Sequence, residues 1–113
     1  MRTIKFRAWE DDRNKMFENA QEHIEFFAML NQDNYHIMQY TGLKDKKGVE
    51  IYEGDIVEYD TDFGDGKLKE EISFKDGGFF TGTQAISELV ISNDTMEHFE
   101  VIGNIYDNPE LLK

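Results

Sequence analysis

The fold of this chain is decided by one stretch of twenty residues, Met38-Gln39-Tyr40-Thr41-Gly42-Leu43-Lys44-Asp45-Lys46-Lys47-Gly48-Val49-Glu50-Ile51-Tyr52-Glu53-Gly54-Asp55-Ile56-Val57. Two apolar, strand-like pieces flank a polar turn that contains three lysines and two glycines. The stretch closes on Glu53-Gly54-Asp55, which leads directly into another apolar segment. We therefore expect the backbone to turn a corner twice here. The stretch contains no nucleophile, base or metal-ligand set at a working spacing.

Outside this stretch, apolar and polar residues alternate in short runs, and this period of two is typical of half-buried strands. We expect strands near residues 3–9, 36–41, 55–60, 67–74, 78–82 and 99–106. Lys75-Asp76-Gly77-Gly78 predicts a tight hairpin, because glycine supplies the positive φ that such turns require. No repeat, linker or low-complexity segment divides the chain. We expect one mainly β domain over residues 1–113, with its strands arranged as a small barrel.

Residues 24–31 fit two kinds of secondary structure. Ile24, Phe27 and Ala28 have the i, i+3, i+4 spacing of one helix face. The alternation of Ile24, Phe26 and Ala28 would equally suit a strand. We expect one short helix near residues 24–31.

The first expected strand has two different faces. Phe6 and Ala8 lie on its apolar face, and Arg7 and Trp9 lie on the opposite face. Trp9 could be a surface recognition residue or could cover the end of the barrel. Packing is the commoner role for a single tryptophan.

The chain is strongly acidic, with 24 Asp and Glu against 12 Lys and Arg and a formal net charge of −12. Such a charge repels phosphate backbones, so nucleic-acid binding starts at a disadvantage. The basic residues gather in two groups, Arg2, Lys5 and Arg7 near the start and Lys44, Lys46 and Lys47 in the central turn. There is no cysteine, which excludes disulfides and thiolate metal sites, and no apolar run approaches the ~20 residues of a membrane span. We expect a soluble, intracellular protein.

The acidic segment after residue 59 partly matches a calcium-binding loop. If Asp60 is position 1, Asp62 falls at position 3 and Glu71 at position 12. The match then fails, because position 5 is Gly64 and position 6 is Asp65 where the motif requires glycine. An ordinary acidic hairpin is the favoured interpretation.

Other motifs of catalysis or metal binding are also incomplete. His23, His36 and His98 lie in three different segments, and none has a second histidine at i+4. The serines Ser73, Ser87 and Ser92 lie outside any nucleophile-elbow pattern. Gly64-Asp65-Gly66-Lys67 lacks the spacing of a phosphate-binding loop. We therefore expect no enzymatic activity, no cofactor and no metal site.

At the central stretch quoted above, the sequence resembles the YopX family of small phage and prophage proteins. Two further blocks carry the resemblance, Ile4-Lys5-Phe6-Arg7-Ala8-Trp9 with Lys15-Met16, and Val101-Ile102-Gly103-Asn104-Ile105-Tyr106-Asp107-Asn108-Pro109-Glu110-Leu111-Leu112. The resemblance implies a β-rich domain with an SH3-like barrel, a phage-associated origin and a place in the cytoplasm of a bacterial host cell. It implies no established activity, so no catalytic residue is carried over.

The resemblance agrees with the physics of the central stretch. In small SH3-like barrels a Gly-Asp step commonly starts a strand after a tight turn. Gly54 would take a left-handed or open backbone geometry, and Asp55 would accept backbone N–H bonds across the turn. We expect structural roles for Thr41, Gly42, Gly48, Ile51, Tyr52, Gly54 and Asp55.

Because the sequence contains no complete catalytic or metal-binding motif, we expect the protein to act by binding a partner. The candidate partner-binding residues are the turn lysines and nearby tyrosines, namely Lys44, Lys46, Lys47, Tyr40, Tyr52 and Tyr59. SH3-like barrels bind peptides or nucleic acids through such residues. We favour a protein-interaction module that docks onto a phage or host protein. In the alternative, the acidic surface imitates a nucleic acid and inhibits a DNA-processing enzyme, and direct nucleic-acid binding ranks third.

Overall fold

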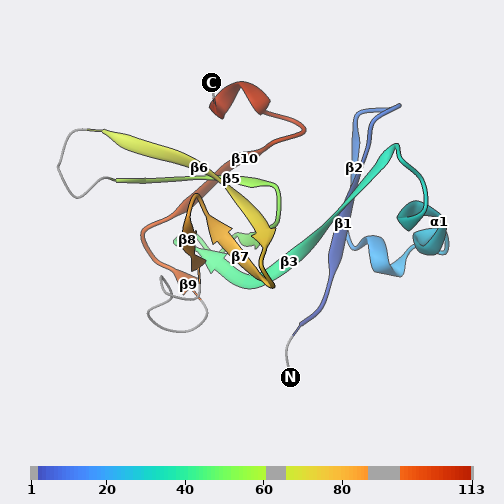
Figure 1. Ribbon diagram of the computed structural model, residues 1–113, viewed down its shortest axis with the longest axis horizontal. Helices are drawn as coiled ribbons and strands as arrows, with labels where there is room; N and C mark the ends of the chain where they lie inside the picture. Colours follow the sequence, from blue (N-terminus) through green and yellow to red (C-terminus); the bar gives the residue numbers. More distant parts are fainter. Residues whose placement is uncertain (1–2, 61–65, 87–94, 113) are drawn as a thin grey trace.

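The computed structural model describes residues 3–60, 66–86 and 95–112 of the chain (Figure 1). Strands account for 52% of the described residues, so the prediction of a mainly β chain is confirmed. The helical elements are the 3₁₀ helix η1 (Ala20–Glu22), the α-helix α1 (Phe26–Leu30) and the 3₁₀ helix η3 (Pro109–Leu112). No helix among these residues is long and apolar enough to cross a membrane.

The strands form two five-stranded sheets. The first has the order β2-β1-β3-β4, and β9 pairs in parallel with the C-terminal end of β3. Its strands are β1 (Phe6–Glu10), β2 (Lys15–Phe17), β3 (Tyr35–Asp45), β4 (Glu50–Tyr52) and β9 (Thr95–Met96). The second sheet has the antiparallel order β10-β5-β6-β7-β8. Its strands are β5 (Asp55–Asp60), β6 (Lys67–Lys75), β7 (Gly78–Thr81), β8 (Gln84–Ala85) and β10 (Glu100–Asn104).

The predicted SH3-like barrel is not confirmed. The pairings between described strands leave the two sheets separate, and they do not close into a barrel. The reason lies in β3, which belongs to the first sheet along its whole length. Residues 35–39 pair with β1, and residues 40–45 pair with β4 and β9.

The strand β3 is longer than the predicted strand 36–41, because it continues through Gly42 to Asp45. Gly42 has φ +87°, and the register with β4 shifts between Tyr40 and Lys44. Such an irregularity bends a strand and redirects its side chains. The hydroxyl of Thr41 stabilises the bend, because it donates to the carbonyl of Ile51 at 2.7 Å and accepts the N–H of Leu43 at 3.1 Å.

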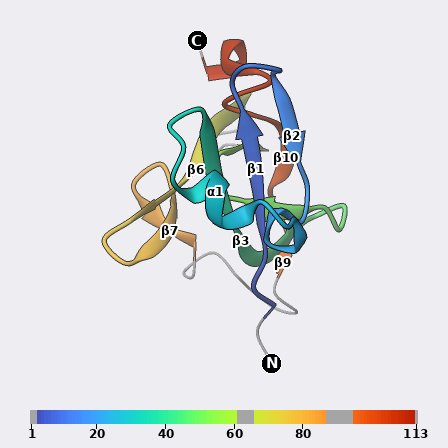
Figure 2. The same ribbon diagram turned by 90° about the vertical axis from the view of Figure 1, so that its right-hand side faces the viewer.

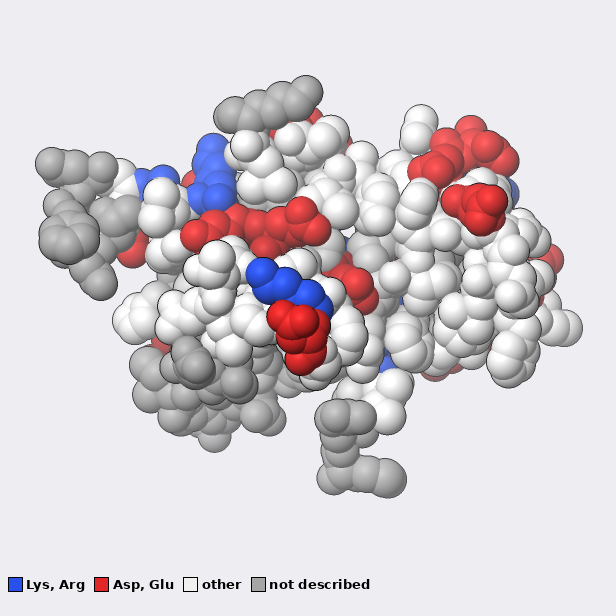
Figure 3. Space-filling model, viewed as in Figure 1, with Lys and Arg blue, Asp and Glu red and all other residues white. Residues whose placement is uncertain are grey.

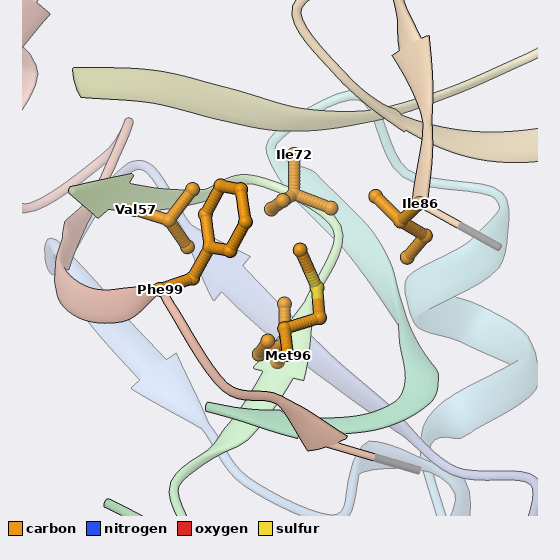
Figure 4. Packing of buried hydrophobic residues seen from close by; sticks show 6 residues of the cluster. Val57, Ile72, Ile86, Met96 and Phe99 are labelled. Carbon is orange, nitrogen blue, oxygen red and sulfur yellow. The ribbon is translucent and has the colours of Figure 1, made fainter. Parts of the chain in front are cut away.

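Two hydrophobic clusters lie on either side of this bend. The larger cluster consists of Ile51, Val57, Ile72, Ile86, Met96 and Phe99. Figure 4 labels all of these residues except Ile51, and the labelled side chains point toward one another. The smaller cluster is built on Ala8, Ala20 and Met29, with Phe6, Phe17, Phe26, Tyr35 and Ile37 packed against it. β3 contributes Ile37 to the smaller cluster and Leu43 to the larger one, so it connects the two.

The short helix near residues 24–31 is confirmed as α1, and the apolar residues predicted to share one of its faces are exposed. Ile24 is 99% exposed and Phe27 is 79% exposed, whereas Met29 is buried. Phe26 packs against Phe6, with ring centroids 5.6 Å apart. The segment is held in this orientation because η1 is tied to β1 by a hydrogen bond from the N–H of Phe6 to the side chain of Gln21. In Figure 2, η1 and α1 cover one face of β1 and β3.

The other strand predictions are close to the observed bounds. The predicted strand 55–60 coincides with β5. The predicted strand 3–9 is observed as β1 at residues 6–10, and 99–106 is shortened to β10 at residues 100–104. The hairpin between β6 and β7 is confirmed, with positive φ at both Asp76 and Gly77, the geometry that suits a two-residue turn. Ile86 is buried in the larger cluster, and residues 87–91 lie outside the described residues.

The turn between β4 and β5 confirms the backbone prediction for Gly54, whose φ is +88°. Its N–H donates to the carbonyl of Ile72 at 2.8 Å, and its carbonyl accepts the N–H of Ile105 at 2.9 Å. A Cβ added here would lie 2.9 Å from the sulfur of Met38. The turn therefore needs glycine both for its φ and for the space.

Gly54→Ala is expected to lower the free energy of unfolding by about 1–3 kcal/mol, because alanine is strained at this φ and must displace Met38. Urea denaturation measures the change. Gly48→Ala isolates the effect of φ, since Gly48 has φ +83° and open space around it. Gly78→Ala is the neutral control, with no positive φ and no close neighbour. If Gly54→Ala costs no more than Gly78→Ala, the backbone argument is wrong.

Candidate functional site

The centre of the molecule contains a buried ion pair between β1 and β5. One nitrogen of the Arg7 guanidinium lies 2.7 Å from Oδ1 of Asp55, and both side chains are more than nine-tenths buried. The other carboxylate oxygen of Asp55 accepts the N–H of Tyr52 at 2.7 Å. Burial raises the pKa of the Asp55 carboxyl, and the charge of Arg7 together with the Tyr52 N–H opposes this rise. The predicted role of Asp55 as an acceptor of backbone N–H groups is confirmed, and the pairing with Arg7 is new.

β1 is buried on both faces. Arg7 therefore lies in the interior, although the alternating sequence of β1 is typical of a strand with one exposed face. Ala8 faces the smaller cluster under η1 and α1, while Arg7 and Trp9 face the second sheet and the C-terminal segment. Trp9 is 5% exposed and stacks on Tyr106 with ring centroids 5.9 Å apart. Of its two interpretations, packing is therefore the correct one.

An open cleft of about 400 Å³ lies next to the ion pair. It is lined by Lys5, by Arg7 of β1, by Glu18 and Asn19 between β2 and η1, by Val49, Glu50, Tyr52 and Asp55 of the central stretch, and by Val101 of β10. Lys5 is paired with Glu50, and Arg7 with Asp55, so both cations of the cleft are already neutralised. The cleft offers no nucleophile with an adjacent base.

Tyr40 and Tyr52, predicted as partner-binding residues, are buried at 7% and 6% exposure. Their ring centroids lie 5.4 Å apart. Nζ of Lys5 lies 5.0 Å from the ring centroid of Tyr40, and Cζ of Arg7 lies 4.7 Å from the ring centroid of Tyr52. Burial, with smaller effects from nearby carboxylates, raises the pKa of Tyr52 to about 12. The structure thus brings these tyrosines together with the N-terminal cations.

Tyr59 is half-buried and packs on Phe99, with ring centroids 4.7 Å apart. Its hydroxyl donates to Glu70 at 2.8 Å, and burial followed by this hydrogen bond raises the pKa of Tyr59 to about 12. Tyr59 belongs to the rim of the larger cluster, and no described contact joins it to the turn lysines.

The turn lysines Lys44, Lys46 and Lys47 are exposed, as a binding surface would require. Lys47 forms an ion pair with Glu100 at 2.9 Å, and this hydrogen bond raises the pKa of the Lys47 ammonium group. No described ring or ion-pair contact joins these lysines to the buried tyrosines Tyr40 and Tyr52.

A structural residue that the sequence analysis missed is Asp45, which is 1% exposed. One of its carboxylate oxygens accepts the N–H groups of Lys47 at 2.8 Å and Val49 at 2.9 Å. The other accepts the N–H of Val101 at 2.9 Å. Asp45 therefore shapes the central turn and ties it to β10. An aspartate before a Lys-Lys-Gly turn is a local signal of such a role, but its contact with Val101 has no signal in sequence.

The candidate motifs of metal binding gain no support from the geometry. Asp60 ends β5 and Glu71 lies within β6, opposite Ile56, so the flanks of the acidic turn are strands. Asp62 lies outside the described residues, as do Ser87 and Ser92. Over residues 3–60, 66–86 and 95–112, no group of three His, Asp or Glu side chains could hold a metal ion.

The feature with the clearest capacity for binding lies elsewhere, on the segment around α1. Ile24, Phe27 and Leu30 are 99%, 79% and 50% exposed, and we call these three residues the α1 apolar surface. In Figure 1, α1 lies at the right-hand end of the molecule, away from the second sheet. The sequence analysis placed Ile24 and Phe27 on one helix face but did not select them for binding, because the spacing of apolar residues does not reveal whether that face packs or stays exposed.

Comparison with solved structures supports the fold. The crystal structure of protein EF1440 from Enterococcus faecalis is similar to this chain over 100% of both chains, with a TM-score of 0.71 and 31% sequence identity. The crystal structure of protein YopX from Bacillus subtilis is also similar over 100% of both chains, with a TM-score of 0.65 and 20% identity. At that identity the second likeness shows the fold alone. No curated protein sequence matches significantly.

The sequence profile of the YopX protein family matches residues 18–113. This range includes the central stretch and the C-terminal block that carried the resemblance, while the N-terminal block at residues 4–9 precedes it. The match covers most of the chain, and the solved structures cover all of it. This chain belongs to the YopX family.

Proposed function

We propose that this protein is a non-enzymatic interaction module that binds another protein. The observation that carries the proposal is the α1 apolar surface. Large apolar side chains exposed together mark interaction sites more often than single exposed residues do. Burying Ile24 or Phe27 in a partner would remove nearly the whole side chain from water, which is the main driving force of association.

The proposal moves the binding site from the central turn to α1. Tyr40 and Tyr52 are buried and serve the interior, so they offer little surface to a partner. The exposed turn lysines Lys44 and Lys46 can add a secondary contact. The site on α1 does not require the groove of a closed SH3-like barrel. A phage or host protein in the bacterial cytoplasm is the partner we propose.

Phe27→Ser and Ile24→Ser are expected to abolish or strongly reduce capture of a partner from host lysate by the immobilised protein. Truncating central interface residues commonly costs about 2 kcal/mol or more of binding energy. Quantitative mass spectrometry of the captured proteins measures the loss. Because both side chains are so exposed, thermal unfolding of the variants should stay near that of the parent protein.

Leu68→Ser is the matched control, since Leu68 is an apolar residue 46% exposed at the start of β6, far from α1 in sequence. It should capture the same partner as the parent protein. Equal capture by the parent protein, Ile24→Ser and Phe27→Ser would exclude the α1 apolar surface as the binding site.

Nucleic-acid mimicry stays the alternative function, and it would explain the net charge of −12 directly. In the view of Figure 3, the carboxylates form separate groups with lysine or arginine beside some of them, unlike a continuous row of phosphates. Direct nucleic-acid binding ranks below it, because the N-terminal cations Lys5 and Arg7 are already paired with Glu50 and Asp55.

A further inference from the structure

The chain segment that carries the α1 apolar surface has charges of one sign, whereas two cations of the preceding hairpin, Arg13 and Lys15, lie over the ring of Phe17 in the smaller cluster. The sequence from residue 16 to residue 43 contains no lysine or arginine. It contains four acidic residues, Glu18, Glu22, Glu25 and Asp33, and all four are exposed. None of the four forms an ion pair with a described residue. In Figure 3 the right-hand end of the molecule, where Figure 1 places α1, is mainly white, with red carboxylates above it.

Neither of the two carboxylates nearest to α1, those of Glu22 and Glu25, caps a helix. Glu25 occupies the position before α1, but its side chain does not cap the helix. Glu22 lies in η1, whose first residues likewise have no side-chain cap. An apolar centre with an unpaired acidic rim is complementary to a surface with apolar residues at its centre and cations around them.

We propose that the α1 apolar surface receives a basic amphipathic segment of a partner protein, an inference that rests on the interaction function proposed above. The apolar side of the segment covers Ile24, Phe27 and Leu30, and its lysines or arginines pair with Glu22 and Glu25. Binding in this mode combines apolar anchoring of an amphipathic helix with electrostatic attraction between its cations and the carboxylates.

Charge argues against the other occupants of this surface. A second copy of the chain would place the same unpaired carboxylates against each other, and like charges across an interface are unfavourable. An anionic lipid surface would be repelled in the same way. A basic protein segment is the occupant that gains from both the apolar centre and the acidic rim.

The test uses the full chain and synthetic peptide probes. The first peptide contains leucine and lysine in a helical amphipathic order, the second has the same composition in scrambled order, and the third replaces every lysine by glutamate. Isothermal titration calorimetry measures binding at two salt concentrations. We expect the first peptide to bind, Ile24→Ser with Phe27→Ser to weaken it by about tenfold or more, and Leu68→Ser to leave it unchanged.

Glu22→Gln with Glu25→Gln tests the acidic rim separately. We expect this variant to bind the first peptide more weakly and with a smaller dependence on salt. Equal binding of the scrambled peptide would show non-specific attraction and overturn the inference, as would no binding of the first peptide or a dimer that Ile24→Ser dissociates in sedimentation.

The glutamate peptide separates this inference from the proposed function. If it binds as well as the lysine peptide and Ile24→Ser with Phe27→Ser weakens both, the surface binds proteins but the choice of a basic partner is wrong. If the two apolar variants change neither peptide binding nor capture from lysate, both the inference and the proposed function fail.

Discussion

Asp55→Ala is expected to lower the free energy of unfolding by about 3–5 kcal/mol, because it leaves the Arg7 guanidinium buried without a counter-charge. The side chain of Arg7 is 9% exposed, and its Nε already lacks a hydrogen-bond partner among the described residues. The Tyr52 N–H would also lose its acceptor. The backbone bond alone would account for only about 0.5–2 kcal/mol.

Urea denaturation at neutral pH measures this loss, and three variants identify its cause. Asp55→Asn keeps an oxygen for the Tyr52 N–H and should lie between the parent protein and Asp55→Ala. Arg7→Ala with Asp55→Ala should cost less than the sum of the two single changes, because the pair is removed together. Asp60→Ala, at the exposed end of the same strand, should stay within about 0.5 kcal/mol of the parent protein. Additive single changes would exclude the ion pair as the cause.

Asp45→Ala is expected to destabilise the protein by about 2–4 kcal/mol. Its carboxylate accepts three backbone N–H groups, and hydrogen bonds to charged groups contribute more than neutral ones. Removing the carboxylate leaves the N–H of Val101 without this acceptor and frees the central turn from β10. The loss should appear in urea denaturation and as faster amide exchange at Lys47, Val49 and Val101.

Asp45→Asn and Asp33→Ala provide the comparison for this change. Asparagine offers one carbonyl oxygen in place of two carboxylate oxygens, so it should recover part of the stability. Asp33 is exposed and should tolerate alanine with little effect. Faster exchange at Lys47 and Val49 with unchanged exchange at Val101 would contradict the proposed tie between the turn and β10.

The candidate site could be predicted only in part, and particular residues show why. The bond from Tyr52 to Asp55 joins residues three apart, so the Gly-Asp turn indicated it. Arg7 lies 48 residues from Asp55, and nothing in the local sequence selects it over Lys5 as the partner. Tyr40 and Tyr52 were expected on a groove, yet the same aromatic residues fill the space beside the buried ion pair.

The sequence by itself determined the six longer strands approximately, the hairpin turn at residues 75–78, the backbone geometry of Gly54 and the resemblance to the YopX family. These features depend on local backbone preferences and on residues close together in the chain. The tertiary structure alone decided that β1 is buried on both faces, that Arg7 pairs with Asp55, and that Ile24 and Phe27 point outward. The reason is that apolar spacing defines a face of a helix or strand, whereas contacts with residues distant in the sequence decide which face is covered. Here Phe6 and Ala8 of β1 pack against Phe26 and Met29 of α1. The opposite side, with Ile24 and Phe27, stays exposed.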